Sequence, residues 1–214
     1  MLSTSVIIPA KGCSSRLPRK NLAIWREKSL VQWSIEYALA EGWTPYVVSE
    51  DPEILDLATR LGSRTILEPP ALLQEHAFEV LKFAATVLET NIVNLPTTSP
   101  LRRPGLIRQT VEMLGNYECV WTGFPLPGHF VRDRSGKIVN RPYRLDGSPP
   151  HSQEFSGNPQ WIQGSCIMGY RYPDILGTMD SIFGCSGIIE ISLEELFDID
   201  YPEDLTKYPT FTSD

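Results

Sequence analysis

Four basic residues gather in a short segment near the N-terminus, directly after an apolar run at 6–8. The segment also contains Gly and Ser, and its cations are Lys11, Arg16, Arg19 and Lys20. Small residues let backbone N–H groups approach an anion closely, and nearby cations offset its charge. The chain as a whole is acidic, with 26 Asp and Glu against 19 Lys and Arg. The segment therefore predicts a site for a small polyanion such as a nucleoside triphosphate, with a solvated basic loop as the alternative.

Two carboxylates lie two positions apart near the other end of the chain, at Asp198 and Asp200. At the end of a short strand or turn, such a pair can converge on a hard divalent cation through oxygen ligands. Magnesium held there would neutralise charge on a triphosphate as pyrophosphate leaves. The alternative is that Asp200 caps a short helix that begins at Pro202.

Composition excludes several classes of protein. A net charge of −7 argues against binding to a nucleic-acid polymer, which needs a basic face. No apolar run is long enough to cross a bilayer, and the first residues lack the apolar core of a signal peptide, so we expect a cytoplasmic protein without membrane contact. The four cysteines form no C-x-x-C pair, which favours reduced thiols over a zinc site. The three histidines are isolated in the sequence and are interpreted as surface or loop residues.

Strand and helix patterns alternate through the first half of the chain. Ser29 and Asp51 are placed to cap helices, and Gly42 and Gly62 are placed to end them. Alternation of this kind predicts an α/β fold with a mostly parallel sheet flanked by helices. The length of 214 residues predicts one domain, 1–214. The predicted strands lie at 46–49, 65–67, 92–95 and 119–121 after the first strand at 6–8, and the predicted helices at 30–41, 52–61, about 74–89 and 104–115.

Ligands of such sheets bind at the carboxyl ends of the strands. This edge would bring together the basic segment, the turn at 49–51 and the loop at 98–99. From 124 to 159 the chain is rich in Pro, Gly, Ser and Arg, with a turn expected near 135–136. We expect an irregular excursion over the site rather than a second domain. Regular structure resumes at 161–162, 166–168 and 187–191.

The N-terminal segment resembles the signature of the CMP-sugar synthetases, the acylneuraminate cytidylyltransferase family, which reads roughly I-I-P-A-R-G-G-S-K-R-I-P-R-K-N. Lys11 keeps the charge of the usual Arg, and the matching residues are Pro9, Ala10, Gly12, Ser14, Arg16, Pro18, Arg19, Lys20 and Asn21. Three further segments are similar in the same order along the chain. The segment at 47–54, V-V-S-E-D-P-E-I, is similar to V-V-S-T-D-D-E-E-I in the family. The segment at 95–102, L-P-T-T-S-P-L-R, is similar to L-Q-P-T-S-P-L-R. The segment at 197–205, F-D-I-D-Y-P-E-D-L, is similar to D-I-D-T-P-E-D-L.

The resemblance implies a Rossmann-like nucleotide-diphospho-sugar transferase fold, a homodimer and a Mg²⁺-dependent cytidylyltransferase. Such an enzyme transfers CMP from CTP to an acidic α-keto sugar, such as a sialic, legionaminic, pseudaminic or Kdo-like acid, and releases pyrophosphate. It also implies roles for particular residues. The residues implied to hold phosphates in catalysis are Lys11, Arg16 and Lys20, and those implied to bind the metal are Asp198 and Asp200. The residues implied to bind the nucleotide are Ala10, Gly12, Ser14, Asn21, Ser49 and Asp51. The residues implied to bind the acceptor are Thr98, Ser99, Arg102, Gln153 and Gln163.

The sequence departs from the family at three positions. Ser15 stands where a Lys is usual, Glu68 replaces the Arg of an R-P-A-E-L-like segment, and Pro96 replaces a Gln. The departure at Glu68 bears on the choice of nucleotide, because that family segment helps to recognise the pyrimidine. These differences leave two alternatives open, a nucleotidyltransferase acting on another sugar phosphate or alcohol phosphate, and a non-catalytic sugar-nucleotide-binding protein. For Gln153 and Gln163, ordinary loop positions are the alternative.

Overall fold

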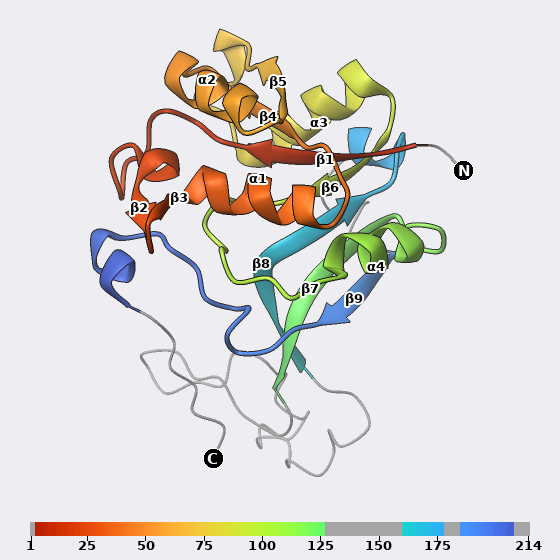
Figure 1. Cartoon of the computed structure of the whole chain (residues 1–214). Coiled ribbons are helices and arrows are strands. Elements are labelled where there is room, and N and C mark those ends of the chain that lie inside the picture. The colour runs from red at the N-terminus through yellow and green to blue at the C-terminus, as the bar shows by residue number, and fades with distance from the viewer. Residues whose placement is uncertain (1–2, 127–159, 178–184, 208–214) are drawn as a thin grey trace, which may run out of the picture.

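A seven-stranded sheet runs through the middle of the molecule, in the order β5-β4-β1-β6-β8-β7-β9 (Figure 1). The computed structural model describes residues 3–126, 160–177 and 185–207. Most of the excursion predicted at 124–159, together with the expected turn at 135–136, lies outside the described residues. The strands are β1 (Thr4–Pro9), β4 (Tyr46–Ser49), β5 (Arg64–Leu67), β6 (Asn91–Asn94), β7 (Cys119–Leu126), β8 (Gln160–Tyr170) and β9 (Ser186–Glu190).

The sheet is mostly parallel, as predicted. β1 pairs in parallel with both β4 and β6, β4 pairs in parallel with β5, and β7 pairs in parallel with β9. Only β8 among these strands runs the other way, since it is antiparallel to both β6 and β7. The two short strands predicted at 161–162 and 166–168 are parts of this single strand β8.

In the described part of the chain four α-helices cover the sheet, and local signals set their ends. Ser29 Oγ accepts a hydrogen bond from Gln32 N at 3.3 Å, and Asp51 Oδ1 accepts one from Glu53 N at 2.9 Å. The third helix begins at Ala77, later than predicted, because His76 is its N-cap, with extended backbone and Nδ1 accepting a hydrogen bond from Phe78 N. The helices are α1 (Leu30–Ala40), α2 (Pro52–Arg60), α3 (Ala77–Leu88) and α4 (Leu106–Met113), and a small hairpin pairs β2 (Ile24–Trp25) with β3 (Lys28–Ser29).

The helices divide between the two faces of the sheet because side chains alternate along each strand. Val6 and Ile8 of β1 pack into one core together with α1, α2 and α4. Ile7, between them, packs into a second core with α3. Figure 1 shows α1 lying across β1 and α4 beside β7 and β9. Within the part of the chain that the structure describes, no helix is both long and apolar enough to span a membrane.

The order of the strands reverses at β1, which lies between β4 and β6. In open α/β sheets the crevice at the carboxyl ends of such strands is the usual ligand site. The C-terminal segment reaches the same place: after β9 it returns to the loop that follows β6, where Ile199 N donates to Thr98 O at 2.8 Å. Ile199 itself is fully buried in a third small core with Leu17 and Trp25. This anchor sets its two neighbours, Asp198 and Asp200, beside the crevice.

Candidate active site

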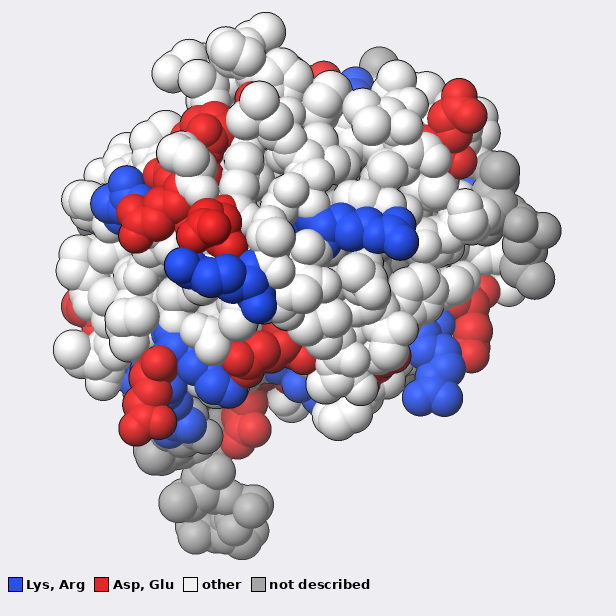
Figure 2. Space-filling model, turned by 45° about the horizontal axis from the view of Figure 1, so that its top comes forward, with Lys and Arg blue, Asp and Glu red and all other residues white. Residues whose placement is uncertain are grey.

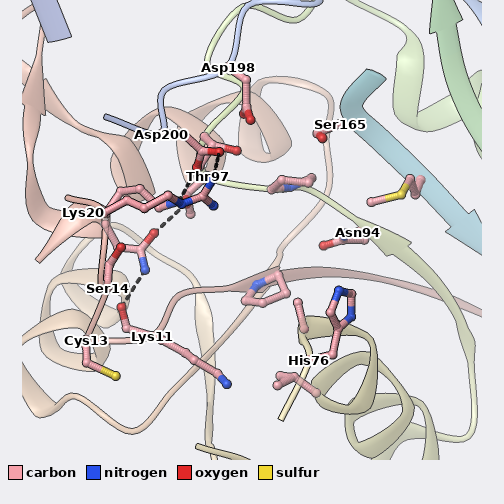
Figure 3. Close-up of a pocket in the computed structure, with 18 residues that line it drawn as sticks. Lys11, Cys13, Ser14, Lys20, His76, Asn94, Thr97, Ser165, Asp198 and Asp200 are labelled. Atoms are coloured by element: carbon pink, nitrogen blue, oxygen red, sulfur yellow. Dashed lines mark hydrogen bonds and ion pairs between the residues drawn. The ribbon is translucent and has the colours of Figure 1, made fainter. Parts of the chain in front are cut away.

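A cavity of about 470 Å³ lies at the carboxyl ends of β1 and β6 (Figure 3). Its wall is built from the basic segment after β1, the start of α3, the end of β6 with the loop that follows, β8, and the C-terminal segment. It brings together residues nearly 200 positions apart in the chain. Its lining includes most of the cations and both of the carboxylates singled out from the sequence: Pro9, Lys11, Cys13, Ser14, Arg16, Lys20, Asn21, His76, Ala77, Val80, Asn94, Pro96, Thr97, Thr98, Ser165, Met168, Asp198 and Asp200.

The basic segment, whose Cys13 and Ser14 line this cavity, has backbone donors without partners among the described residues. Within the described residues, the N–H groups of Cys13, Ser14 and Ser15 make no hydrogen bond, whereas Gly12 N donates to Glu50 Oε1 at 2.9 Å. Successive unpartnered N–H groups in a tight loop form a concave site for anions. Gly12 is required here because a Cβ at that position would lie 2.7 Å from the Asp51 Cβ. The local geometry therefore suits a phosphate, and it depends on close approach between the segment and the start of α2.

Two cations of the basic segment share one carboxylate. Arg16 Nη1 lies 2.7 Å from Asp200 Oδ2, and Lys20 Nζ lies 2.8 Å from Asp200 Oδ1. Arg19, in contrast, turns away from the cavity and pairs with Glu53 at 2.7 Å and Asp51 at 3.3 Å. Figure 2 shows Lys and Arg side chains in small groups next to Asp and Glu side chains, with no continuous basic surface on this face. Such local charge suits a small anion better than a polymer.

Asp200 does not cap the helix that follows it. That role belongs to Asp204, whose Oδ2 accepts hydrogen bonds from Asp200 N at 3.0 Å and Tyr201 N at 2.8 Å. The Asp200 carboxylate is therefore free to face the cavity and its cations. The capping alternative drawn from the sequence was wrong for this residue.

The chemistry of the Asp198 and Asp200 pair fits a hard divalent cation. Burial raises the pKa of Asp198; a hydrogen bond from Thr98 opposes that rise, and the charge of Asp200 adds to it. A cation between the two carboxylates would offset both the burial and the repulsion. No group of three or more His, Cys, Asp or Glu side chains suited to a metal occurs among the described residues. A metal here would complete its shell with water and phosphate oxygens, as Mg²⁺ commonly does.

Lys11 is held by backbone carbonyls at the edge of the cavity. Its Nζ donates to Leu72 O at 3.0 Å, Leu73 O at 3.2 Å and Glu75 O at 3.0 Å, and it lies 3.5 Å from Glu68 Oε1. Its ammonium therefore fixes the 3₁₀ turn before α3. In this state the Lys11 ammonium stabilises the loop, and a phosphate would have to compete with those carbonyls for its hydrogen bonds.

Glu68 is a buried carboxylate whose charge Lys11 offsets. The residue is 1% exposed, and neither of its carboxylate oxygens has a hydrogen-bond partner in the part of the chain described. Burial raises the pKa of Glu68, the charge of Lys11 opposes that rise, and the charge of Glu50 adds to it. This departure from the family signature thus places an under-satisfied acid directly behind the basic segment.

A hydrogen-bonded chain ties the two loops of the cavity together. Thr97 Oγ1 donates to Asn21 Oδ1 at 2.5 Å, and Asn21 Nδ2 donates to Lys11 O at 2.7 Å. Asn21 and Thr97 are both buried. A buried amide that is hydrogen-bonded through both its oxygen and its nitrogen rigidifies the segments that it joins.

Several residues singled out from the sequence do not line the cavity. Ala10 is fully buried, and its N donates to Val48 O at 2.9 Å. Ser49 Oγ accepts from Asp51 N at 3.0 Å, and Asp51 caps α2, so both residues shape the turn after β4. Ser99 Oγ donates to Asp198 Oδ1 at 3.4 Å. Gln163 lines a second cavity, described below, and Gln153 lies outside the described residues.

The Arg102 guanidinium donates its hydrogen bonds to groups of the protein itself. Its Nε donates to Cys166 O at 2.7 Å, its Nη1 donates to Ser34 Oγ at 3.3 Å, and its Nη2 donates to Pro96 O. The guanidinium thus joins α1, the loop after β6 and strand β8. An acceptor carboxylate would have to displace these bonds to reach it.

Three cavity residues were missed by reasoning from the sequence, namely His76, Asn94 and Ser165. Asn94 had a usable signal, because it is a polar residue at the end of a parallel strand directly before the loop at 95–102. His76 was interpreted as an isolated surface or loop residue, yet it caps α3 through Nδ1 and borders the cavity. Ser165 carried no signal, since its position depends on an irregularity in the pairing of β7 and β8.

Comparisons with known proteins identify the family and the fold of the chain. The profile of the cytidylyltransferase family matches residues 5–124. The chain is 32% identical over 121 residues to 3-deoxy-manno-octulosonate cytidylyltransferase of Vibrio campbellii, covering 55% of this chain and 48% of that protein. It is 32% identical over 117 residues to pseudaminic acid cytidylyltransferase of Campylobacter jejuni, covering 50% of each. The chain thus spans about half the length of these curated relatives.

A solved structure extends the likeness to nearly the whole fold. It is that of CMP:2-keto-3-deoxy-manno-octonic acid synthetase complexed with CTP, with a TM-score of 0.70, 17% identity and coverage of 95% of both chains. At that identity the likeness shows the fold, and it confirms the predicted α/β class. Together with the match over residues 5–124, which include the basic segment and the loop after β6, these findings show that the chain belongs to the cytidylyltransferase family.

Proposed function

We propose that this protein transfers CMP from CTP to the anomeric hydroxyl of an acidic α-keto sugar and releases pyrophosphate. The observation that carries the proposal is the convergence, in one cavity, of a loop with free N–H donors, two cations and two carboxylates. The relatives named above are cytidylyltransferases for sugars of this class, which supports the choice of donor and acceptor.

The basic segment would hold the triphosphate. The N–H groups of Cys13 and Ser14 and the side chains of Arg16 and Lys20 would bind the phosphate oxygens, with Lys11 at the edge of the same cavity. Positioning and charge stabilisation supply most of the catalysis of phosphoryl transfer, so no covalent intermediate on the protein is needed. Because Asn21 and Thr97 lock the two loops together, the donors are already oriented before the substrate arrives.

Asp198 and Asp200 would hold Mg²⁺. Enzymes of this family generally use a divalent metal, and the donor set described above fits magnesium. When bound, the ion would neutralise charge on the triphosphate as pyrophosphate departs. Arg16 and Lys20 would then exchange their contacts with Asp200 for contacts with phosphate.

The reaction is an in-line displacement at the α-phosphorus of CTP. The anomeric oxygen of the acceptor forms a new bond to the α-phosphorus, and the bond from that phosphorus to the oxygen bridging to the β-phosphate breaks. Pyrophosphate leaves with the bridging oxygen, and the hydroxyl proton passes to water. Thr98, which lines the cavity, would contact the acceptor. Ser99, Gln163 and Gln153 are further candidates for that contact.

The test is pyrophosphate release from CTP and Mg²⁺ with a panel of nonulosonic and Kdo-type acids, with the product mass measured in each reaction. A CMP-sugar product is the expected result. If a product forms only with a sugar phosphate or an alcohol phosphate, the acceptor is a compound of that class and not an acidic α-keto sugar. Bound CTP without release from any acceptor would identify a non-catalytic nucleotide-binding protein. We also propose a homodimer, for which light scattering of the full chain is the direct measurement.

A further inference from the structure

A second cavity of about 320 Å³ opens beside the first and shares with it a wall that includes His76, Asn94, Ser165 and Met168. It lies between the start of α3, the end of β6 and strand β8. None of the described residues that line it is Lys, Arg, Asp or Glu. An acid bound across both cavities would therefore direct its carboxylate into the first, where the cations are, and its remaining substituents into the second.

One wall of the second cavity is hydrocarbon. Phe78, Leu81 and Tyr170 are 4%, 2% and 3% exposed, and the rings of Phe78 and Tyr170 pack edge to face with centroids 5.6 Å apart. The Tyr170 hydroxyl lies 3.5 Å from Met168 Sδ, so its polar atom is already engaged. A ligand hydroxyl against this wall would lose its hydrogen bonds to water without replacement, whereas a methyl group would gain contact.

The wall shared with the first cavity offers an acceptor that has no partner among the described residues. Asn94 is 5% exposed, and its Oδ1 has no hydrogen-bond partner within the described residues. Figure 3 shows Asn94 between Ser165 and His76, with its side-chain oxygen turned toward the cavity. Buried amide oxygens are nearly always paired in native proteins, so this one is suited to a donor from a ligand. His76 Nδ1 accepts from Phe78 N at 3.3 Å, which leaves the proton of the neutral ring on Nε2.

An irregularity in the sheet brings Ser165 to the same wall. Trp121 pairs with Met168, but its neighbour Thr122 pairs with Gly164, so residues 165–167 bulge out of the ladder. Thr122 Oγ1 fixes the bulge, with contacts to Gly164 O at 3.1 Å and Ile167 O at 3.2 Å. Bulges of this kind re-aim side chains next to ligand sites. Ser165 thus becomes a second polar group beside Asn94.

Building on the proposed function, we propose that the second cavity selects the acceptor. Asn94 Oδ1 accepts a hydrogen bond from an acceptor hydroxyl, and the wall of Phe78, Leu81, Met168 and Tyr170 contacts an N-acyl or deoxy methyl substituent. The preferred acceptor is therefore an acidic keto sugar that carries such a group, rather than one hydroxylated at every position. Both Asn94 and Met168 touch the acceptor away from the reacting atoms; Asn94 strengthens its binding, and Met168 is the specificity residue.

The first experiment compares two nine-carbon keto acids that differ only at one carbon, N-acetylneuraminic acid with an acetamido group and its analogue with a hydroxyl. Their dissociation constants are measured by calorimetry on the full chain with CMP and Mg²⁺ present. We expect the N-acetyl acid to bind at least about tenfold more tightly, since one methyl group in an apolar pocket is worth about that factor. Equal affinity, tighter binding of the hydroxyl analogue, or no binding of either acid would overturn the proposal.

Variants then test the two walls separately. Asn94→Ala should weaken binding of both acids by about 3- to 10-fold, the value of one lost hydrogen bond, without lowering the melting temperature, because its Oδ1 has no partner in the free protein. Met168→Gln should abolish the preference for the N-acetyl acid, and Met168→Leu should keep it. Thr86→Ala, on the exposed surface of α3, is the matched control and should bind both acids as the parent does.

The outcomes separate this proposal from the proposed function. Pyrophosphate release only with the hydroxylated acid would sustain the cytidylyltransferase activity and overturn the selection proposed here. If no acid supports pyrophosphate release but the N-acetyl acid binds and Asn94→Ala weakens that binding, the proposed cytidylyltransferase activity is wrong. The proposal that the second cavity binds the acceptor is then still supported.

Discussion

Lys20 Nζ lies 2.8 Å from Asp200 Oδ1, a contact between residues 180 positions apart in the chain. Arg16 occupies the other oxygen of the same carboxylate at 2.7 Å. In the free protein, the cations proposed to hold phosphate are thus paired with a carboxylate proposed to hold metal. Binding of a metal–triphosphate would rearrange these contacts without creating an unpaired charge, which keeps the cost of the exchange small.

Asp200→Asn tests that arrangement. We expect activity to fall by at least about 100-fold, the usual effect of removing one group that stabilises transition-state charge. The melting temperature should move by no more than about 3 °C, because Arg16 is half exposed and ion pairs that keep contact with solvent add little stability. Steady-state pyrophosphate release and thermal unfolding are the two measurements. Glu203→Gln, exposed in the turn that follows, should change neither, and near-parental turnover of Asp200→Asn would remove the metal role.

Glu68→Gln should raise stability at neutral pH. The pKa of Glu68 is raised by burial, so the folded state binds its proton more tightly than the unfolded state, and the ionised form lowers stability. That cost is present above the raised pKa and disappears as the pH falls toward the ordinary value of 4.5. Urea unfolding at several pH values should show a gain for the variant near pH 7 that vanishes below about pH 4.5. A gain that does not depend on pH would contradict this account.

Arg102→Lys distinguishes a structural role from an acceptor-binding one. A single ammonium cannot reach Cys166 O, Ser34 Oγ and Pro96 O together, so buried acceptors lose their partners. We expect the free energy of unfolding to fall by about 2–3 kcal/mol, measured by chemical denaturation. Arg108→Lys, exposed on α4, should stay within about 0.5 kcal/mol of the parent. A higher KM for the acceptor with unchanged stability would instead assign Arg102 to substrate.

The rate of alkylation of Cys13 should show whether a ligand occupies the first cavity. It is exposed and lines that cavity, whereas Cys185 is exposed elsewhere. CTP with Mg²⁺ at ten times its dissociation constant should slow alkylation of Cys13 by about tenfold and leave Cys185 unchanged, as peptide mass spectrometry would show. Burial raises the pKa of Cys119 to about 12 and of Cys166 to about 11, so both should stay unmodified in the folded protein. Equal protection of Cys13 and Cys185 would point to a general change in the protein rather than occupancy of the cavity.

Local signals in the sequence predicted the elements well. Ser29 and Asp51 cap α1 and α2 as expected, and Gly42 and Gly62 adopt positive φ just after those helices end. The mostly parallel sheet followed from the alternation of strands and helices. These features were accessible because caps, turns and periodicity act over a few residues. The late start of α3 and the hairpin of β2 and β3 were not predicted. The hairpin depends on distant parts of the chain, because Trp25 is buried in one cluster with Leu17 and Ile199. The start of α3 depends on a cap at His76, which is not among the usual capping residue types.

The sequence by itself determined which chemical groups this protein has for binding an anion, and the motifs whose order along the chain marks its family. Only the tertiary structure decided how those groups are used. In the folded protein Asp200 pairs with Lys20 and Arg16, and Arg102 donates hydrogen bonds to backbone carbonyls. Asn94 and Ser165 line the cavities. The reason is physical: a carboxylate, a guanidinium or an amide takes its role from the partners within about 3 Å. Those partners come from strands and loops that only folding brings together.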